Sequence, residues 1–138
     1  KKNKIKIKII DFSKKREIND LLKILKFNNI QLICLAGFLK ILSKDFIKSF
    51  KGKIINIHPS LLPKYKGLNT HERVLENNEK FTGCSVHFVN EKLDGGKIIL
   101  QKKIKILKKD DLKSLKNKVL KEEYKLYPKS IIKILSNY

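Results

Sequence analysis

Residues 31–58 read QLICLAGFLKILSKDFIKSFKGKIINIH, in which two short apolar runs flank an amphipathic segment. The run at 31–36 has the length and the continuous apolarity of a strand buried on both faces of a parallel sheet. A helix initiated by Ser43 follows it, with Phe46, Ile47 and Phe50 at helical spacing, and residues 53–58 form the next strand. A strand, a helix and a strand in this order predict an α/β fold with a parallel sheet.

The same patterns extend on both sides of this segment. Upstream, residues 5–12 alternate between charged and apolar side chains like a strand, and residues 14–28 carry apolar residues at helical spacing. Downstream, a helix is predicted over 70–77. Two strands, over 82–89 and 97–106, are separated by a glycine-containing connection that suits an antiparallel pair. The sheet is therefore expected to be mixed.

The last element is a long helix that is expected to begin at Asp110, where an acidic side chain suits the helix N-terminus, and to bend or break at Pro128. The chain has 138 residues, the length of one domain, and neither a linker nor an internal repeat divides it. The predicted fold class is α/β: a mostly parallel twisted sheet flanked by helices, Rossmann-like, with an antiparallel C-terminal part.

The formal charge of +20 would ordinarily suggest a nucleic-acid partner. However, the excess is carried by residues 1–51 (net +10) and 99–138 (net +8), whereas residues 52–98 carry only +2. Of the 33 basic residues, 31 are lysines, although nucleic-acid recognition favours the arginine fork. A solvated lysine surface is the favoured interpretation. A field that steers an anionic substrate and a basic nucleic-acid-binding module are the alternatives.

Cysteine usage and hydropathy bear on the compartment. Cys34 and Cys84 lie in apolar stretches without the spacing of a zinc or redox site, which predicts buried free thiols in a reducing cytoplasm. No apolar run reaches the length of a membrane span, and the first residues do not resemble a signal peptide. The sequence contains no methionine, so we expect that its true start is missing.

The chemistry-bearing residues gather where the strand at 53–58 ends. Side chains alternate across a strand, so Asn56 and His58 project to one side, and Pro59 makes the chain leave the sheet. Asp94, in a glycine-rich turn, is the second candidate. An amide and an imidazolium can stabilise an oxyanion while a carboxylate raises the histidine pKa and relays protons, which predicts acyl-type transfer without a covalent nucleophile. Taken singly, each feature also fits a plain strand cap or turn.

The other histidines are less informative. His87 shares a strand face with Ser85 and either supports the Asp94 loop or is an ordinary core histidine. His71, near a helix start, is expected to be a capping or surface residue. No ligand spacing indicates a metal site, so no metal cofactor is expected.

Several spaced segments together resemble the phosphoribosylglycinamide formyltransferase family, over about residues 30–130. They are LAGFLKIL (35–42), NIHPSLLPKYKGLNTH (56–71), GCSVHFV (83–89), LDGG (93–96) and LYP (126–128). The resemblance implies transfer of the formyl group of 10-formyltetrahydrofolate to the amine of glycinamide ribonucleotide in purine biosynthesis. These two small molecules are the expected partners.

The resemblance also implies residue roles. Asn56 and His58 would polarise the formyl oxygen, Asp94 would tune His58 and shuttle protons, and Ser85 and His87 would support them. Glu123 would contact the nucleotide. The residues expected to bind folate are Leu39, Lys40, Ile41, Leu42, Asn56, Asn90, Glu91, Lys92, Leu93 and Asp94.

Three departures from the family pattern stand out. The family's first strand and its Gly-Ser-Asn phosphate loop have no counterpart here, so residues 1–138 are expected to be a single formyltransferase domain that lacks about 50 N-terminal residues. Asn69 stands where the family often has His, and Lys40 where it often has Arg. Formyltetrahydrofolate hydrolase, methionyl-tRNA formyltransferase and sugar-nucleotide formyltransferases share the Asn-x-His and Asp pattern and remain alternatives.

Overall fold

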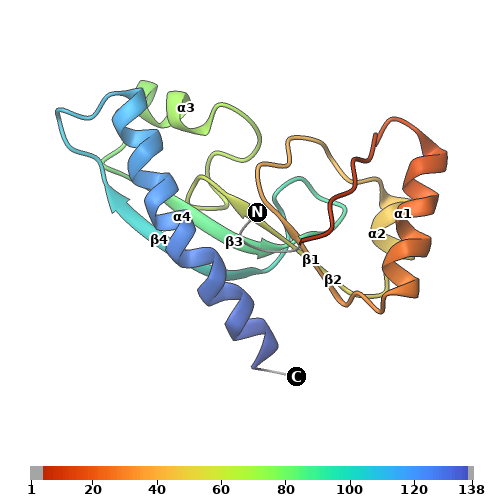
Figure 1. Cartoon of the computed structure of the whole chain (residues 1–138). Coiled ribbons are helices and arrows are strands. Elements are labelled where there is room, and N and C mark those ends of the chain that lie inside the picture. Colours follow the sequence, from red (N-terminus) through yellow and green to blue (C-terminus); the bar gives the residue numbers. More distant parts are fainter. Residues whose placement is uncertain (1–4, 137–138) are drawn as a thin grey trace.

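The computed structural model describes residues 5–136, and Figure 1 shows how their helices and strands are arranged. Residues 1–4, part of the N-terminal segment considered above, lie outside the described range. In chain order the elements are α1 (Lys15–Phe27), β1 (Leu32–Leu35), α2 (Lys44–Ser49), β2 (Lys53–His58), α3 (Thr70–Glu76), β3 (Phe81–Phe88), β4 (Ile98–Lys105) and α4 (Leu112–Leu135).

The four strands form one mixed sheet in the order β1-β2-β3-β4. β1 runs parallel to β2, whereas β3 is antiparallel to both β2 and β4. The predicted α/β class, the parallel pair and the antiparallel C-terminal part are therefore confirmed. The sheet register places Asn56 opposite His87 and His58 opposite Ser85, which sets the geometry of the candidate site.

The two faces of β2 are covered by different helices because its side chains alternate. Ile55 lies under α4 in a cluster with Cys84, Val86, Val119 and Leu126. The neighbouring Ile54 faces the other way, into a cluster formed with α1 and α2. Figure 1 shows α4 crossing the β3–β4 part of the sheet, while α1 and α2 lie at the β1 end.

Capping fixes where two helices begin. The Ser43 side chain accepts a hydrogen bond from the Phe46 amide at 3.1 Å, as predicted for α2. Asp111 forms a capping box with Ser114 at the start of α4, and an acidic side chain there complements the helix dipole. Of the bend or break expected at Pro128, the break is wrong, because α4 is one helix from Leu112 to Leu135. The helix continues because Leu126, Ser130 and Ile134 remain buried against the sheet on the opposite side from Pro128.

Two expectations for the N-terminal part are also wrong. Residues 5–12 form no strand, because they have no hydrogen-bonded neighbour strand among the described residues, and Ile7 and Ile9 are exposed. β1 is a strand but is not buried on both faces, and Cys34 within it is exposed. Cys84 is buried, as expected, and both thiols are free.

Within residues 5–136, no helix combines the length and the apolarity that crossing a membrane would require.

Candidate active site

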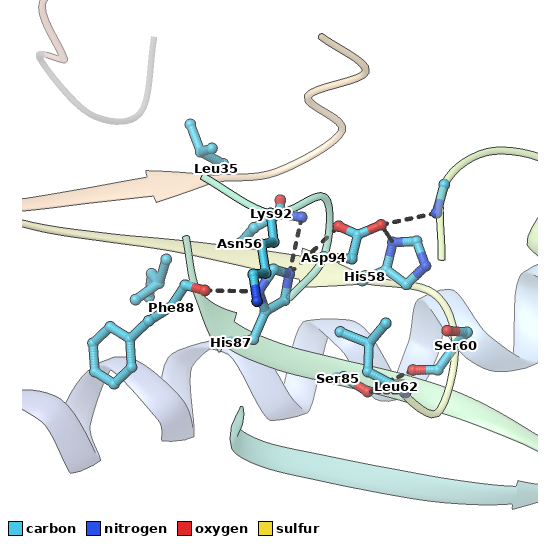
Figure 2. A network of polar contacts seen from close by, with 12 residues as sticks. Leu35, Asn56, His58, Ser60, Leu62, Ser85, His87, Phe88, Lys92 and Asp94 are labelled. Carbon is cyan, nitrogen blue, oxygen red and sulfur yellow. Dashed lines mark hydrogen bonds and ion pairs between the residues drawn. The ribbon is translucent and has the colours of Figure 1, made fainter. Parts of the chain in front are cut away.

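The candidate site lies on the face of the sheet away from α4, at the end of β2. Asn56 and His58 project from β2 on this face, and their pairing partners His87 and Ser85 project from β3 beside them. Figure 2 shows these four side chains with Asp94 beside Asn56 and close to His58. The prediction that Asn56 and His58 share one side of the strand is confirmed, because Ile55 packs into the cluster on the opposite face.

Asp94 reaches the strand end because the chain folds back sharply after β3. A Cβ on Gly96 would overlap the carbonyl oxygen of Phe88, so only glycine allows this close approach. The fold-back is held by a hydrogen bond from the Phe88 amide to the Lys97 carbonyl at 2.9 Å. Asp94 itself adopts a left-handed backbone conformation with φ of 43°. The glycine-rich turn thus delivers a carboxylate to the site.

The Asp94 carboxylate lies between two imidazole rings. Its Oδ2 is 3.5 Å from His58 Nδ1, and its Oδ1 is 3.7 Å from His87 Nε2. The side chains of His58 and His87 are almost fully buried, with 7% and 3% exposed, and that of Asp94 is only 10% exposed. Asp94 also accepts a hydrogen bond from the Gly67 amide at 2.9 Å. Low exposure strengthens these electrostatic contacts relative to contacts in water.

His87 is held as a neutral ring that can accept a hydrogen bond. Its Nδ1 lies 2.9 Å from the Phe88 carbonyl, which only accepts, so Nδ1 carries the proton. Burial lowers the pKa of His87, which favours the neutral ring. Nε2 is then an acceptor for the Asn56 amide, whose nitrogen lies 3.5 Å away. In this tautomer Nε2 can orient Asn56 but has no proton to donate to the Asp94 Oδ1 that lies 3.7 Å away. His87 is thus a buried histidine whose ring nitrogens contact the Phe88 carbonyl and the Asn56 amide.

The segment after β2 closes over His58. His58 Nε2 lies 2.8 Å from the carbonyl oxygen of Tyr65, so this nitrogen donates. When the ring is protonated, Nδ1 can donate to Asp94 at the same time. The Tyr65 carbonyl and the Gly67 amide are backbone groups, so no side-chain pattern in the sequence could have identified them.

Ser85 lies beneath this segment, and its hydroxyl both donates and accepts hydrogen bonds. Its Oγ donates to the Ser60 carbonyl at 2.5 Å and accepts from the Leu62 amide at 3.1 Å. Gln101 of β4 donates to the same hydroxyl at 2.8 Å. Sequence reasoning missed Gln101. The only signal was its position opposite Ser85 in the antiparallel pair, and that pairing register could not be read from the sequence.

The segments expected to bind folate lie next to each other. Glu91 forms ion pairs with Lys44 and Lys48 of α2, which join the loop after β3 to the segment that leads into α2. Leu39 and Ile41 of that segment are 78% and 73% exposed, whereas Leu42 is buried in the cluster with Phe46. Leu39, Ile41, Leu68 and Leu93 are all exposed apolar residues.

Glu123 lies away from these groups, and the surroundings of His71 differ from those expected. Glu123, on α4, is half-buried on the α4 side of the sheet, where burial raises its pKa and its charge helps to raise that of Cys84. His71 is not the cap, because Asn69 occupies that position; it is partly buried, and its Nδ1 is buried with no hydrogen-bond partner among residues 5–136. Burial lowers the pKa of His71.

Among residues 5–136 no three His, Cys, Asp or Glu side chains are placed to hold a metal ion.

Comparison with known proteins identifies the family. The formyl transferase family model matches residues 3–131. Phosphoribosylglycinamide formyltransferase of Haemophilus influenzae is 45% identical over 119 residues, which are 86% of this chain and 56% of that protein. The human trifunctional purine biosynthetic protein adenosine-3 is 46% identical over 103 residues, 75% of this chain and 10% of that protein.

Solved structures agree with the sequence comparisons. The crystal structure of phosphoribosylglycinamide formyltransferase from Bacillus halodurans superposes with a TM-score of 0.82 at 36% identity, covering 87% of this chain and 62% of that one. The corresponding protein from Brucella melitensis gives a TM-score of 0.81 at 42% identity, covering 90% and 64%. This chain therefore spans a little over half the length of the bacterial relatives. The match over nearly every residue places the chain in the formyl transferase family.

Proposed function

We propose that this chain transfers the formyl group of 10-formyltetrahydrofolate to the amine of glycinamide ribonucleotide. The observation that carries the proposal is the position of Asp94 between His58 and His87, with the Asn56 amide beside them. An amide donor, an imidazole and a carboxylate around one point are what a formyl group needs when its oxygen gains negative charge. The name of the relative at 45% identity, a phosphoribosylglycinamide formyltransferase, supports the choice of acceptor, and the name of the relative at 46% identity supports a place in purine biosynthesis.

The reaction requires one bond exchange and one proton exchange. The acceptor amine bonds to the formyl carbon, the bond from that carbon to the folate nitrogen breaks, and the proton lost by the amine replaces the formyl group on that nitrogen. In this proposal Asn56 donates one amide hydrogen to the formyl oxygen while its other hydrogen stays on His87 Nε2, at 3.5 Å. His87 thereby fixes the direction in which Asn56 donates.

His58 and Asp94 handle the proton. His58 Nε2 now donates to the Tyr65 carbonyl at 2.8 Å, so in this proposal it donates to the formyl oxygen in exchange for that contact. Asp94 stabilises the charged ring from Nδ1 and is the group near enough to take up a proton from the amine. The Gly67 amide holds the carboxylate in place during this exchange.

The surroundings fit a folate. Leu39, Ile41 and Leu93 offer exposed apolar surface in the two segments that are expected to bind folate. A pterin ring would lie on this surface with Asn90, Glu91, Lys92 and Asp94 along one edge and Lys40 and Leu42 in the facing segment. The role of Glu123 in holding the nucleotide rests on the family resemblance, since its side chain lies on the α4 side of the sheet.

The test is to remove the two groups that handle the proton. We expect His58→Ala and Asp94→Asn each to lower kcat for formyl transfer by about 100- to 10,000-fold, because each removes charge stabilisation present mainly in the transition state. Tetrahydrofolate binding, measured by calorimetry, should change little. Asp20→Asn makes the same chemical change on the surface of α1, where Asp20 pairs with Lys23, and should leave kcat unchanged.

Near-normal turnover in either variant would remove the residue from the mechanism. Release of free formate without formylated nucleotide would instead identify a hydrolase and contradict the proposed acceptor.

A further inference from the structure

We propose that Gln101 is a positioning residue for this site: together with Ser85 it clamps the turn at residues 60–62, and the clamp holds the segment that contacts His58 and Asp94. The expected effect on the rate of formyl transfer rests on the proposed function. The statement that Gln101 and Ser85 hold the turn depends only on the hydrogen bonds described next.

The clamp joins β4, β3 and the turn after β2. Gln101 Nε2 lies 2.8 Å from Ser85 Oγ and 2.8 Å from the Leu62 carbonyl. Ser85 Oγ donates to the Ser60 carbonyl at 2.5 Å and accepts from the Leu62 amide at 3.1 Å. Gln101 and Ser85 are direct partners in the β3–β4 pairing, so the sheet itself holds them together.

Donors and acceptors in the clamp can be assigned in one way only. The Ser60 carbonyl cannot donate, so the single Ser85 hydrogen goes to it. Ser85 Oγ must then accept a hydrogen bond from the Gln101 amide nitrogen, and the Leu62 carbonyl must accept a second one from the same nitrogen. Both hydrogens of the Gln101 amide are thereby used, and a carboxylate at position 101 would place an oxygen against the Leu62 oxygen. The site therefore needs an amide at this position.

The turn that the clamp holds leads directly to the catalytic groups. His58 and Pro59 precede the turn, and the chain beyond it carries the Tyr65 carbonyl that accepts from His58 Nε2. Two residues later the Gly67 amide donates to Asp94. The segment 59–67 thus touches the proposed catalytic groups at two points of its backbone and is pinned to the sheet at its start by Gln101 and Ser85. If the turn at residues 60–62 is held less firmly, the contacts of the Tyr65 carbonyl with His58 and of the Gly67 amide with Asp94 should both weaken.

The first experiment measures how firmly the clamp holds the turn and does not depend on formyl transfer. Amide hydrogen exchange is followed by NMR in the whole chain with Gln101→Glu, which keeps the shape of the side chain but removes both donors. We expect exchange at Leu62 and at Gly67 to accelerate by about tenfold, the effect of losing about one net hydrogen bond. The Val86 amide, in the core of β3, should keep its rate. Asn117→Asp makes the same chemical change on the outer surface of α4 and should alter none of these rates.

A second variant separates loss of the donors from the added charge. Gln101→Met also removes both donors, and because Gln101 is an exposed residue on an edge strand, neither substitution opens the core. Acceleration at Gly67 in both variants supports the clamp. An unchanged Gly67 rate overturns it, even where Leu62 exchanges faster, because the effect then stays within the turn.

The second experiment measures formyl transfer. A positioning residue should lower kcat by about 10-fold or more while KM for the formyl donor stays within a factor of about two, because misplacing a catalytic group affects the transition state more than binding. A purely structural role would instead lower the amount of active enzyme and leave kcat per active site unchanged. If the unsubstituted chain shows no transfer, the proposed function fails, and the exchange rates still decide on the clamp.

Discussion

The two halves of the molecule contain similarly apolar segments but bury them very differently. In residues 53–136, β3 has six buried residues in a row, and α4 buries five of its side chains against the sheet. In residues 5–52, α1 has no buried residue, and β1 has none either. The difference shows that burial depends on a second layer that covers the element, and not on the apolarity of the element itself.

The candidate site spans this boundary. Asn56, His58, His87 and Asp94 belong to the well-buried half, where hydrogen bonds and packing restrict each side chain. Leu39 and Ile41, the proposed folate surface, belong to the open half. The proposed catalytic groups thus all lie in the better-buried half, while the proposed folate surface combines Leu39 and Ile41 of the open half with the exposed Leu93 of the other half.

The largest expected contrast between the halves is thiol reactivity. Burial is the main cause that raises the pKa of Cys84 to about 12, with help from Glu123 and Glu122, so very little thiolate forms at pH 8. Partial burial raises the pKa of Cys34 as well, yet this residue is exposed on β1. At pH 8 in a disulfide reagent such as DTNB, Cys34 should react at least about 1,000-fold faster than Cys84, which reacts only when the fold opens.

Release of the thionitrobenzoate product measures both rates in one experiment. Cys34→Ser should abolish the fast phase and leave the slow one. Two phases of similar rate in the unsubstituted chain would mean that β3 is no better covered than β1.

The next contrast is in core stability, and two leucines on helices provide matched probes. Leu115 of α4 is fully buried, and Leu115→Ala should lower the free energy of unfolding by about 3 kcal/mol through lost burial and a residual cavity. Leu25 of α1 is only partly buried, and Leu25→Ala should cost about 1 kcal/mol. Urea unfolding at fixed pH measures both. Equal losses would contradict the difference in burial between the two halves.

Much of the fold could be predicted because the elements carry local signals. The range of β2, the antiparallel pairing of β3 with β4, and the Ser43 cap all follow from periodicity or from a single capping side chain. The failures share one physical cause. Whether residues 5–12 pair as a strand, and whether Cys34 is covered, depends on neighbours that no local pattern specifies. The break considered at Pro128 is absent for the same reason, since packing elsewhere on α4 keeps the helix continuous.

In the candidate site, too, local patterns could be predicted and contacts between distant segments could not. Alternation along β2 was enough to predict that Asn56 and His58 face one way, and the glycine-rich turn made Asp94 a candidate to which the resemblance gave a role. It could not be known from the sequence that the Tyr65 carbonyl and the Gly67 amide would contact these groups, because any residue supplies such backbone atoms. Gln101 was missed because its role depends on the register between two strands.

The smallest expected effect is the response of stability to acid, and it too should come from the buried half, since all three histidines lie there. Burial lowers the pKa of His87 below its ordinary value of 6.5, so the unfolded chain binds a proton at a higher pH than the folded chain does. Stability is therefore complete above about pH 6.5 and declines as the pH falls through that value toward the folded pKa. In urea unfolding between pH 8 and 5, His87→Gln should flatten this decline in part, because His71, whose pKa burial also lowers, still contributes. An equally steep decline in the variant would show that His87 takes up a proton as readily in the folded chain as in the unfolded one, and the neutral ring that orients Asn56 would then have to be abandoned.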